Sequence, residues 1–221
     1  MGLDSFKTES SSRKGIGGRP ENSHDISDRQ MDILTGMVAS DSSLGKQSYG
    51  NPFIITHMTN PIYMSWLDNQ LGELSTGLEN STSGKSDWSV KDRYTLRTSR
   101  DPKLEKFDWV EDGEKVIPES IRFNSLVAKV WYAGDGSMLW NNSHDSKRAC
   151  FASASEHNRS IIKSKLESKE FNPSINGNRV DILCEETDEF IEWLGKPVPG
   201  YGYKWETDSY QDYVLKKDLM P

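Results

Sequence analysis

The chain has 221 residues, of which 34% are hydrophobic and 28% are charged, and its mean hydropathy is −0.73. This length suits one large domain or two fused half-domains. No apolar run reaches the roughly 18 residues that a membrane-spanning helix needs, so we expect no membrane partner. The sequence starts without an apolar signal region and contains only Cys150 and Cys184, which match no zinc motif. We therefore expect a reduced, intracellular protein that is not secreted.

The formal net charge of −7 argues against a uniformly basic surface for nucleic acid. The acids are concentrated near the C-terminus, because residues 185–221 carry nine Asp and Glu against four Lys. Residues 85–106, by contrast, carry seven bases against four acids. Binding to nucleic acid depends on where positive charge is placed rather than on the total, so the charge leaves such a partner open.

Residues 1–26 are rich in Ser, Gly, Arg and Glu and show no apolar periodicity, which predicts a disordered N-terminal tail. A helix is predicted to start after Ser27, because Ser27 and Gln30 have the spacing of a capping box. Apolar residues then recur at helical spacing up to Asp41, namely Met31, Leu34, Met37 and Val38.

The next elements are predicted from β-branched stretches, apolar periodicity and breaking residues. In chain order they are a polar loop (45–51), a strand (53–59), an amphipathic helix (62–74), a polar linker (75–88), a strand (93–98), a short helix (103–110) and an extended link (115–118).

A second series of elements follows in the same order. It comprises a helix (124–134) that ends at Asp135, a polar loop (140–146), a strand (148–155), a helix (158–166), a strand (179–184) and a helix (186–194). This order predicts a duplicated α+β chain with a first half over 27–120 and a second half over 121–221. Further strands are expected within the loops, and the C-terminal extension 195–221 has no counterpart in the first half.

Two short apolar segments each end in an aspartate, Asp41 and Asp135, and these lie 94 residues apart. Small residues precede each acid, so two helices packed side by side would bring the acids together. A hard cation such as Mg²⁺ takes carboxylate and phosphate oxygens, and the pair therefore favours metal-assisted phosphodiester hydrolysis. For either aspartate alone, a simple helix end remains the alternative.

At these residues the chain resembles the LAGLIDADG homing endonucleases. Residues 34–41 line up with the nine-residue signature of that family, with Ser42 in place of its final glycine. Residues 129–136 are similar to the aromatic variant of the signature, with Val130 in place of its central glycine. The resemblance covers roughly residues 27–194. It implies a pseudo-twofold duplicated α+β fold, with two packed central helices and two antiparallel saddle sheets that lie in the DNA major groove.

The resemblance also implies site-specific cleavage of double-stranded DNA by a monomer with internal pseudo-twofold symmetry. Cleavage would depend on Mg²⁺ or another divalent cation such as Mn²⁺. Asp41 and Asp135 would be the metal ligands and catalytic acids, one for each DNA strand.

His57 lies on the first predicted strand after Asp41, where the family carries a polar residue near the hydrolytic water. It is therefore a candidate catalytic residue, with Ser153 as its expected counterpart and a structural role as the alternative. Lys115 and Lys129 are both candidates for the basic active-site residue of the family.

Arg93, Thr95 and Arg97 alternate with apolar neighbours, which places the three on one strand face. Arginine can pair with guanine O6 and N7, and threonine can contact a thymine methyl group or a phosphate. Five further bases are expected to hold phosphates, namely Lys85, Lys91, Arg100, Arg148 and Arg179. An ordinary solvated strand face is the alternative.

Three functions remain open from the sequence. The first is a metal-dependent DNA endonuclease, which the two acids favour because binding alone does not need paired carboxylates. The second is a cleavage-deficient DNA-binding protein or intron maturase on the same scaffold, which Ser42 and the undetermined basic residue keep open. The third is an interaction module without nucleic acid, which rests on the acidic charge.

Overall fold

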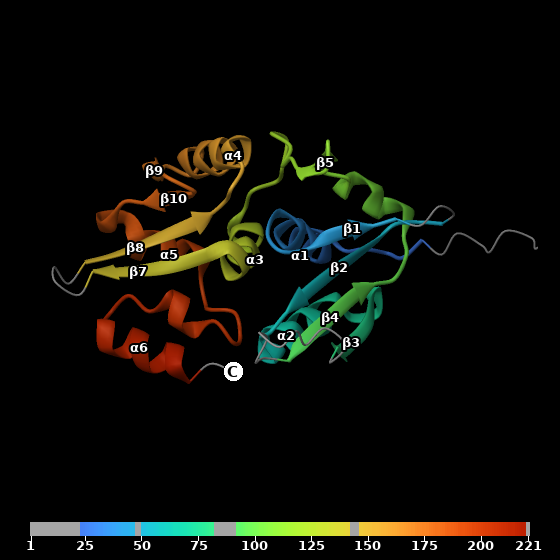
Figure 1. Cartoon of the computed structure of the whole chain (residues 1–221), viewed down its shortest axis with the longest axis horizontal. Helices are drawn as coiled ribbons and strands as arrows, with labels where there is room; N and C mark the ends of the chain where they lie inside the picture. Colours follow the sequence, from blue (N-terminus) through green and yellow to red (C-terminus); the bar gives the residue numbers. More distant parts are fainter. Residues whose placement is uncertain (1–22, 47–49, 82–91, 142–145, 220–221) are drawn as a thin grey trace, which may run out of the picture.

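Two helices form the centre of the computed structural model, which describes residues 23–46, 50–81, 92–141 and 146–219. Helix α1 (Asp28–Ala39) packs side by side with α3 (Ser125–Asp135), and a four-stranded antiparallel sheet lies on each side of the pair (Figure 1). The pseudo-twofold α+β fold with two central helices is thus confirmed. Within the described ranges, no helix is both long and apolar enough to cross a bilayer.

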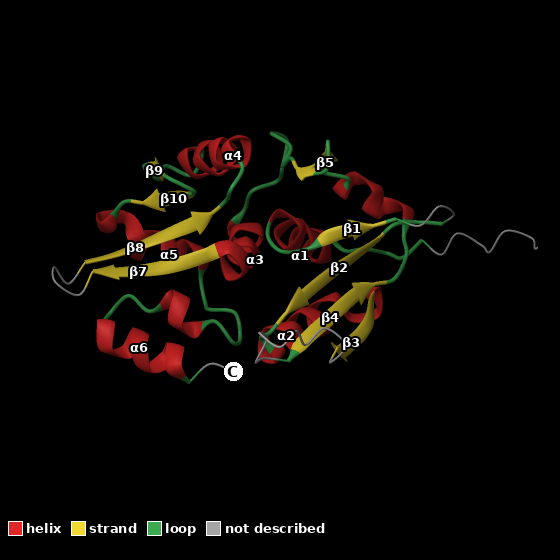
Figure 2. Ribbon diagram, in the orientation of Figure 1, coloured by secondary structure: helices red, strands yellow, loops and turns green. Residues whose placement is uncertain are grey.

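The two sheets have the same topology, which Figure 2 shows on either side of the central helices. The first sheet has the order β1-β2-β4-β3, and the second has the order β7-β8-β10-β9. The strands of the first are β1 (Ser43–Gly45), β2 (Phe53–Met58), β3 (Ser75–Ser81) and β4 (Arg93–Thr98). Those of the second are β7 (Gly136–Asn141), β8 (Ser146–Ala152), β9 (Pro173–Asn176) and β10 (Arg179–Ile182).

Further helices cover one face of each sheet. Helix α2 (Pro61–Leu71) packs against β3 and β4, α4 (Glu156–Glu167) against β9 and β10, and α5 (Thr187–Leu194) against β8. The remaining elements are the 3-10 helices η1 (Gly72–Leu74), η2 (Pro102–Phe107), η3 (Cys184–Glu186) and η4 (Gly202–Trp205), the hairpin β5 (Val110–Glu111) and β6 (Glu114–Lys115), and α6 (Tyr210–Asp218).

Side chains alternate between a covered and an open face of each sheet, as the period of two requires. In the first sheet, Ile54 and Leu96 are buried against the helices, whereas Arg93 and Arg97 are exposed on the opposite face. In the second sheet, the buried apolar residues are Ala149, Phe151, Val180 and Ile182. Each sheet therefore packs through one face and leaves the other face open.

Four strands lie in segments that the sequence pattern left as loops or linkers. Residues 75–88 were predicted as a linker but contain β3, and β7 extends to Asn141 within the predicted polar loop. The short strands β1 and β9 were expected only as further strands within the loops, without residue ranges. All four are edge strands, which bury less apolar surface and so carry a weaker alternation. Strand β3 also contains a register shift between Ser75 and Leu78.

The ends of α1 and α3 follow from local chemistry. The predicted capping box is present, because the Gln30 backbone N–H donates to Ser27 Oγ and the Ser27 N–H donates to Gln30 Oε1. Asn124 caps α3 by accepting from the Val127 N–H at 2.9 Å. The Asn124 side-chain amide also donates to Asp32 of α1 at 2.8 Å, which ties the first turn of α3 to α1.

Small residues set how closely α1 and α3 approach. A Cβ atom built on Gly36 would lie 2.6 Å from Val130 Cβ and 2.7 Å from the Val127 carbonyl oxygen. One on Gly134 would lie 2.6 Å from Ser40 Cβ. Gly36 thus leaves the space that Val130 fills, which explains how α3 accommodates valine where the signature has glycine.

The C-terminal extension contacts both halves. The Asn60 side-chain amide donates to the Gly200 carbonyl at 2.6 Å, and the rings of Tyr63 and Tyr201 lie 5.0 Å apart. The Tyr132 hydroxyl of α3 donates to the Lys204 carbonyl at 3.1 Å. These contacts fix the position of Lys204 relative to the central helices.

The Gly36→Ala variant should be less stable, because its new methyl group overlaps Val130 and a backbone carbonyl. Overpacking of this kind costs about 1–3 kcal/mol, against which the better helix propensity of alanine recovers up to about 1 kcal/mol. Urea unfolding measures the difference. Gly202→Ala is the control, because nothing lies within 4 Å of a Cβ atom there. Equal stability of both variants and the wild type would contradict the tight helix contact.

Candidate functional site

Asp41 and Asp135 lie at the same end of the central helix pair. Asp41 directly follows Ser40, the C-cap of α1, and Asp135 is the last residue of α3. A Cβ atom built on Gly134 would lie 3.4 Å from the Asp41 carboxylate, so this carboxylate packs beside the residue that precedes Asp135. The structure therefore brings the two acids of the signature segments together.

The two carboxyl groups have different surroundings. Asp41 is exposed, whereas Asp135 is partly buried beside α1. Burial and, after it, the nearby Asp41 carboxylate raise the pKa of Asp135 to about 7, while Lys115 acts in the opposite direction. The site thus concentrates negative charge that the protein alone offsets only in part.

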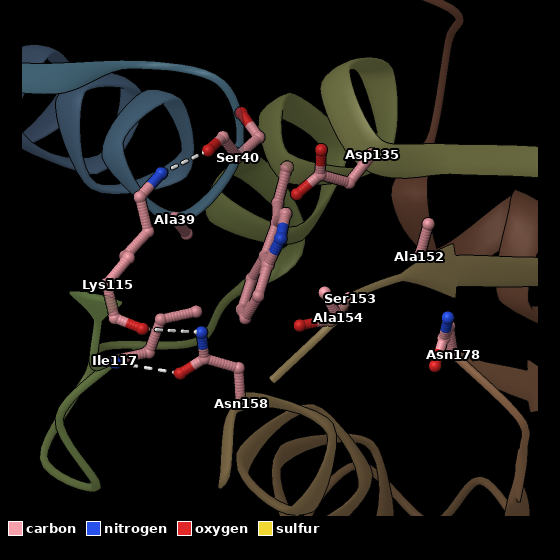
Figure 3. A pocket seen from close by; sticks show the side chains of 11 residues that line it. Ala39, Ser40, Lys115, Ile117, Asp135, Ala152, Ser153, Ala154, Asn158 and Asn178 are labelled. Atoms are coloured by element: carbon pink, nitrogen blue, oxygen red, sulfur yellow. Dashed lines mark hydrogen bonds between the residues drawn. The ribbon is translucent and has the colours of Figure 1, made fainter. Parts of the chain in front are cut away.

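One lysine from each half lies at the end of each helix. The Lys115 amino group, from β6, donates to the Ser40 carbonyl (Figure 3). It also donates to the Ser42 carbonyl at 3.1 Å. The Lys204 amino group, from η4, donates to the carbonyls of Ala133 at 2.6 Å and Gly134 at 3.3 Å. Each cation therefore binds the negative end of one helix dipole.

Close to the acids, Lys204 is buried and Lys115 is half-buried. Burial lowers the pKa of Lys115, and the Asp135 and Asp41 carboxylates oppose this effect. Burial lowers the pKa of Lys204 to about 8, and the same two carboxylates again oppose it. The four groups form a charge cluster with one acid and one base from each half.

Of the two lysines proposed from the sequence, the structure places Lys115 at the acids and Lys129 elsewhere. The Lys129 amino group would lie 3.6 Å from a Cβ atom on Gly195, and its pKa is lowered by burial and by Arg29. The sequence analysis missed Lys204, which lies in the extension without an evident counterpart. Its distance in sequence from Asp135 could have identified it, since Lys115 follows Asp41 by 74 residues and Lys204 follows Asp135 by 69.

His57 lies on the open face of β2. Strand β1 pairs Ser43 with Ile55, and the same register continued by two residues places His57 opposite Asp41. The His57 Nδ1 atom lies 2.8 Å from the Thr95 hydroxyl. Burial lowers the pKa of His57, and Arg93 and Arg97 lower it further. The imidazole is therefore mainly neutral at pH 7 and can accept a proton.

The residue equivalent to His57 in the second half is Ala152, not Ser153. Strand β7 pairs Ser137 with Cys150, so the continued register places Ala152 opposite Asp135. Ser153 is one residue further, and a shift of one residue turns a side chain to the other face of a strand. The Ser153 backbone N–H instead donates to the Asn178 carbonyl at 2.8 Å.

A polar cavity of about 350 Å³ opens beside Asp135. Figure 3 shows Lys115, Ser153, Asn158 and Asn178 around it. The Asn158 side-chain amide donates to the Lys115 carbonyl and its oxygen accepts from the Ile117 N–H, both at 2.9 Å. Asn158 thereby holds the segment that carries Lys115, and the cavity has room for water or a phosphate oxygen beside the acid.

The bases proposed as DNA contacts have three kinds of surroundings. Arg93 and Arg97 are exposed on the open face of β4, while Thr95 between them is only 4% exposed and contacts His57. Arg100 lies 5.4 Å above the Phe53 ring. Arg148 and Arg179 both pair with Asp181, and Lys85 and Lys91 lie outside the described residues.

Asp41 and Asp135 are the residues that could hold a divalent cation. Within the described ranges, no group of three or more His, Cys, Asp and Glu side chains is placed to hold a metal. Two carboxylates fit Mg²⁺, because this ion keeps several waters and takes substrate phosphate oxygens for its remaining positions.

The Asp135→Asn variant should lose a pH dependence of stability. Because the folded-state pKa of about 7 exceeds the ordinary value of 3.8, the folded protein binds this proton more tightly than the unfolded chain. The free energy of unfolding should therefore fall as pH rises from about 4 to about 7. Asp135→Asn should remove this fall and stabilise the protein at pH 7.5 by on the order of 2–4 kcal/mol.

Urea unfolding in EDTA at pH 5 and pH 7.5 measures this effect. Asp218→Asn, an exposed acid on the last helix, is the matched control and should keep the wild-type pH dependence. A pH dependence that is the same in Asp135→Asn and the wild type would contradict the raised pKa.

Comparison with known proteins defines the family. The LAGLIDADG DNA endonuclease family matches residues 31–187. Among solved structures, the homing endonuclease I-WcaI bound to its DNA recognition sequence is similar with a TM-score of 0.69 and 17% identity, over 83% of this chain and 88% of that chain. The structure of I-DmoI in complex with DNA and Mn has a TM-score of 0.49 and 17% identity, over 76% of this chain and 97% of that chain.

No curated protein matches the chain in sequence. At 17% identity, the likeness to I-WcaI concerns the fold alone. The family match, by contrast, spans most of the chain and includes both aspartates. The chain therefore belongs to the LAGLIDADG DNA endonuclease family.

Proposed function

We propose that the protein is a site-specific double-stranded DNA endonuclease, a homing endonuclease, that hydrolyses one phosphodiester bond in each strand with a divalent cation. The observation that carries this proposal is the meeting of Asp41 and Asp135 at the ends of two packed helices, each of which also binds a lysine. We also propose that the protein is a monomer and acts inside the cell.

The paired acids account for the need for a cation. When bound, Mg²⁺ or Mn²⁺ would stabilise charge on the scissile phosphate and favour a nucleophilic water. Asp41 and Asp135 would hold it from the two halves, so one acid serves each strand. Burial and the Asp41 charge together raise the pKa of Asp135 to about 7, and a cation at this place would favour its charged form.

The lysines and His57 would handle protons and phosphate charge. Lys115 and Lys204 are anchored on helix-end carbonyls, so their ammonium groups stay close to the acids without blocking them. The pKa of Lys204 at about 8 allows this group to exchange a proton near neutral pH. The neutral imidazole of His57 would orient or deprotonate water in the first half. Ala152 occupies the equivalent position in the second half and has no group that could do so.

The open sheet faces would contact the DNA. Arg93 and Arg97 are exposed on one such face, and Arg148 and Arg179 are half-exposed on the other. Arginine forks suit both base edges and phosphates. A binding-only protein or maturase explains these faces equally well, but it does not explain why two acids and two lysines meet at the ends of the central helices.

Asp41→Asn and Asp135→Asn should each abolish double-strand cleavage while DNA affinity is kept or increased. A neutral amide is a poor Mg²⁺ ligand, and its introduction removes repulsion with phosphate. The assay selects a target duplex from a randomised pool and follows its cleavage with Mg²⁺ and with EDTA, with Asp218→Asn as the charge-matched control. Normal cleavage by either site variant would show that the acid merely ends its helix.

Arg97→Ala should weaken target binding by on the order of 1–3 kcal/mol and relax preference at one base position if Arg97 reads a base. Arg97→Lys, which keeps the charge but loses the fork, should preserve most of the salt dependence. Affinity measured over a salt series should fall steeply, because phosphate contacts release counterions. A flat affinity between low and moderate salt would contradict DNA binding by this face.

A further inference from the structure

Asp181 is an acid in the middle of the open face of the second sheet. Its neighbours in β10, Val180 and Ile182, are buried against the helices, so alternation directs Asp181 to the opposite face. It is nevertheless only 1% exposed. The side chains of Arg148 and Arg179, which are 40% and 41% exposed, cover it. A buried carboxylate therefore lies beneath two half-exposed guanidinium groups.

Both oxygens of this carboxylate are used. Asp181 Oδ2 accepts from Arg148 Nη1 at 3.0 Å and from the Asn176 side-chain amide at 3.3 Å. Asp181 Oδ1 accepts from Arg179 Nε at 2.8 Å. In the described part of the chain, Arg179 makes no hydrogen bond through its two terminal nitrogens. Asp181 thus holds Arg179 at the base of its fork and leaves both terminal nitrogens for a ligand. Arg148 is held through the fork itself, because its Nη1 donates to Asp181 and its Nη2 donates to Cys184 Sγ at 3.8 Å. Each of these two nitrogens keeps a second N–H for a ligand.

The first sheet differs at the same position. Ile55 of β2 and Cys150 of β8 occupy equivalent places, because they pair with Ser43 and Ser137, each two residues after its aspartate. On its other side, Ile55 pairs with Arg97 of β4, and Cys150 pairs with Asp181 of β10. Asp181 is therefore the pseudo-twofold counterpart of Arg97. Within the described ranges, no carboxylate pairs with Arg97. One sheet presents single arginines, whereas the other presents two arginines joined by one acid.

Simple stabilisation of the fold explains this cluster poorly. Burying a carboxylate has a desolvation cost of several kcal/mol, which its ion pairs offset only in part. General phosphate binding explains it no better, since a negative charge on a DNA-facing surface weakens attraction to phosphate. Orientation of the arginines explains both the burial of the carboxylate and its place on this face, because a fixed guanidinium loses less conformational entropy when it binds a base edge.

We propose that Asp181 is a positioning residue that holds Arg148 and Arg179 as a fixed pair of base readers on the second sheet. This inference rests on the proposed function, since it requires DNA on the open sheet faces. The ligand groups are guanine O6 and N7, which match an arginine fork in the major groove. The half of the target beneath the second sheet is then read more stringently than the half beneath the first.

Asp181→Asn separates this role from a structural one, because the two affinities should change in opposite directions. Loss of the negative charge should strengthen binding to an unrelated duplex about twofold or more. Loss of arginine positioning should weaken binding to the selected target, so that the ratio of the two affinities falls on the order of 10-fold. Selection from a randomised duplex pool should show the lost preference in one half of the target only. Asp218→Asn, with the same charge change, should keep the wild-type ratio.

Arg148→Lys and Arg179→Lys keep the charge and test the same idea if Asp181→Asn does not fold. Each should relax preference in the same half of the target with little change in salt dependence. Unchanged discrimination in Asp181→Asn, or an equal loss in both halves, would overturn the positioning role and leave the endonuclease proposal intact. Failure of the wild-type protein to bind any duplex would instead overturn the proposed function, and this inference with it.

Discussion

The close packing of α1 against α3 is the contact on which the rest of the structure depends. Gly36 and Gly134 let the two helices approach until a single added carbon would overlap Val130 or Ser40. Because both helices end at the same place, this contact joins the two halves and also brings Asp41 beside Asp135. The fold and the candidate site therefore rest on the same small residues, and a side chain large enough to separate the helices would damage both.

Bringing the two acids together creates an electrostatic problem that the surrounding chain partly relieves. Burial and the Asp41 charge raise the pKa of Asp135 to about 7. Lys115 and Lys204 bring positive charge to the same place, and each is held by carbonyls at a helix end. Such a site is less stable than a neutral one would be, which is common where function requires charge in a fixed arrangement. The proposed function, which needs a cation and a phosphate at this position, would account for the stability given up at Asp135.

The sequence predicted the central helices, the interior strands and the two acids, because each carries a strong local pattern. The edge strands β1, β3, β7 and β9 were expected as further strands within the loops but could not be placed, since pairing on one side rather than apolar alternation stabilises them. Lys204 and the His57 counterpart could not be placed, because their positions depend on register and on contacts with distant residues such as Asn60 and Tyr63. The link between Asp181 and its two arginines likewise appears only when β8 and β10 pair.

Anomalous diffraction from a crystal of the protein with its selected duplex and Mn²⁺ tests the central claim most directly. The account predicts Mn²⁺ within about 2–3 Å of the Asp41 and Asp135 carboxylates, in contact with the phosphates that are cut. It also predicts that the open sheet faces, including Arg97 and Arg179, lie against the bases. Mn²⁺ bound away from the two acids, or a duplex seated on the helix-covered faces, would contradict it.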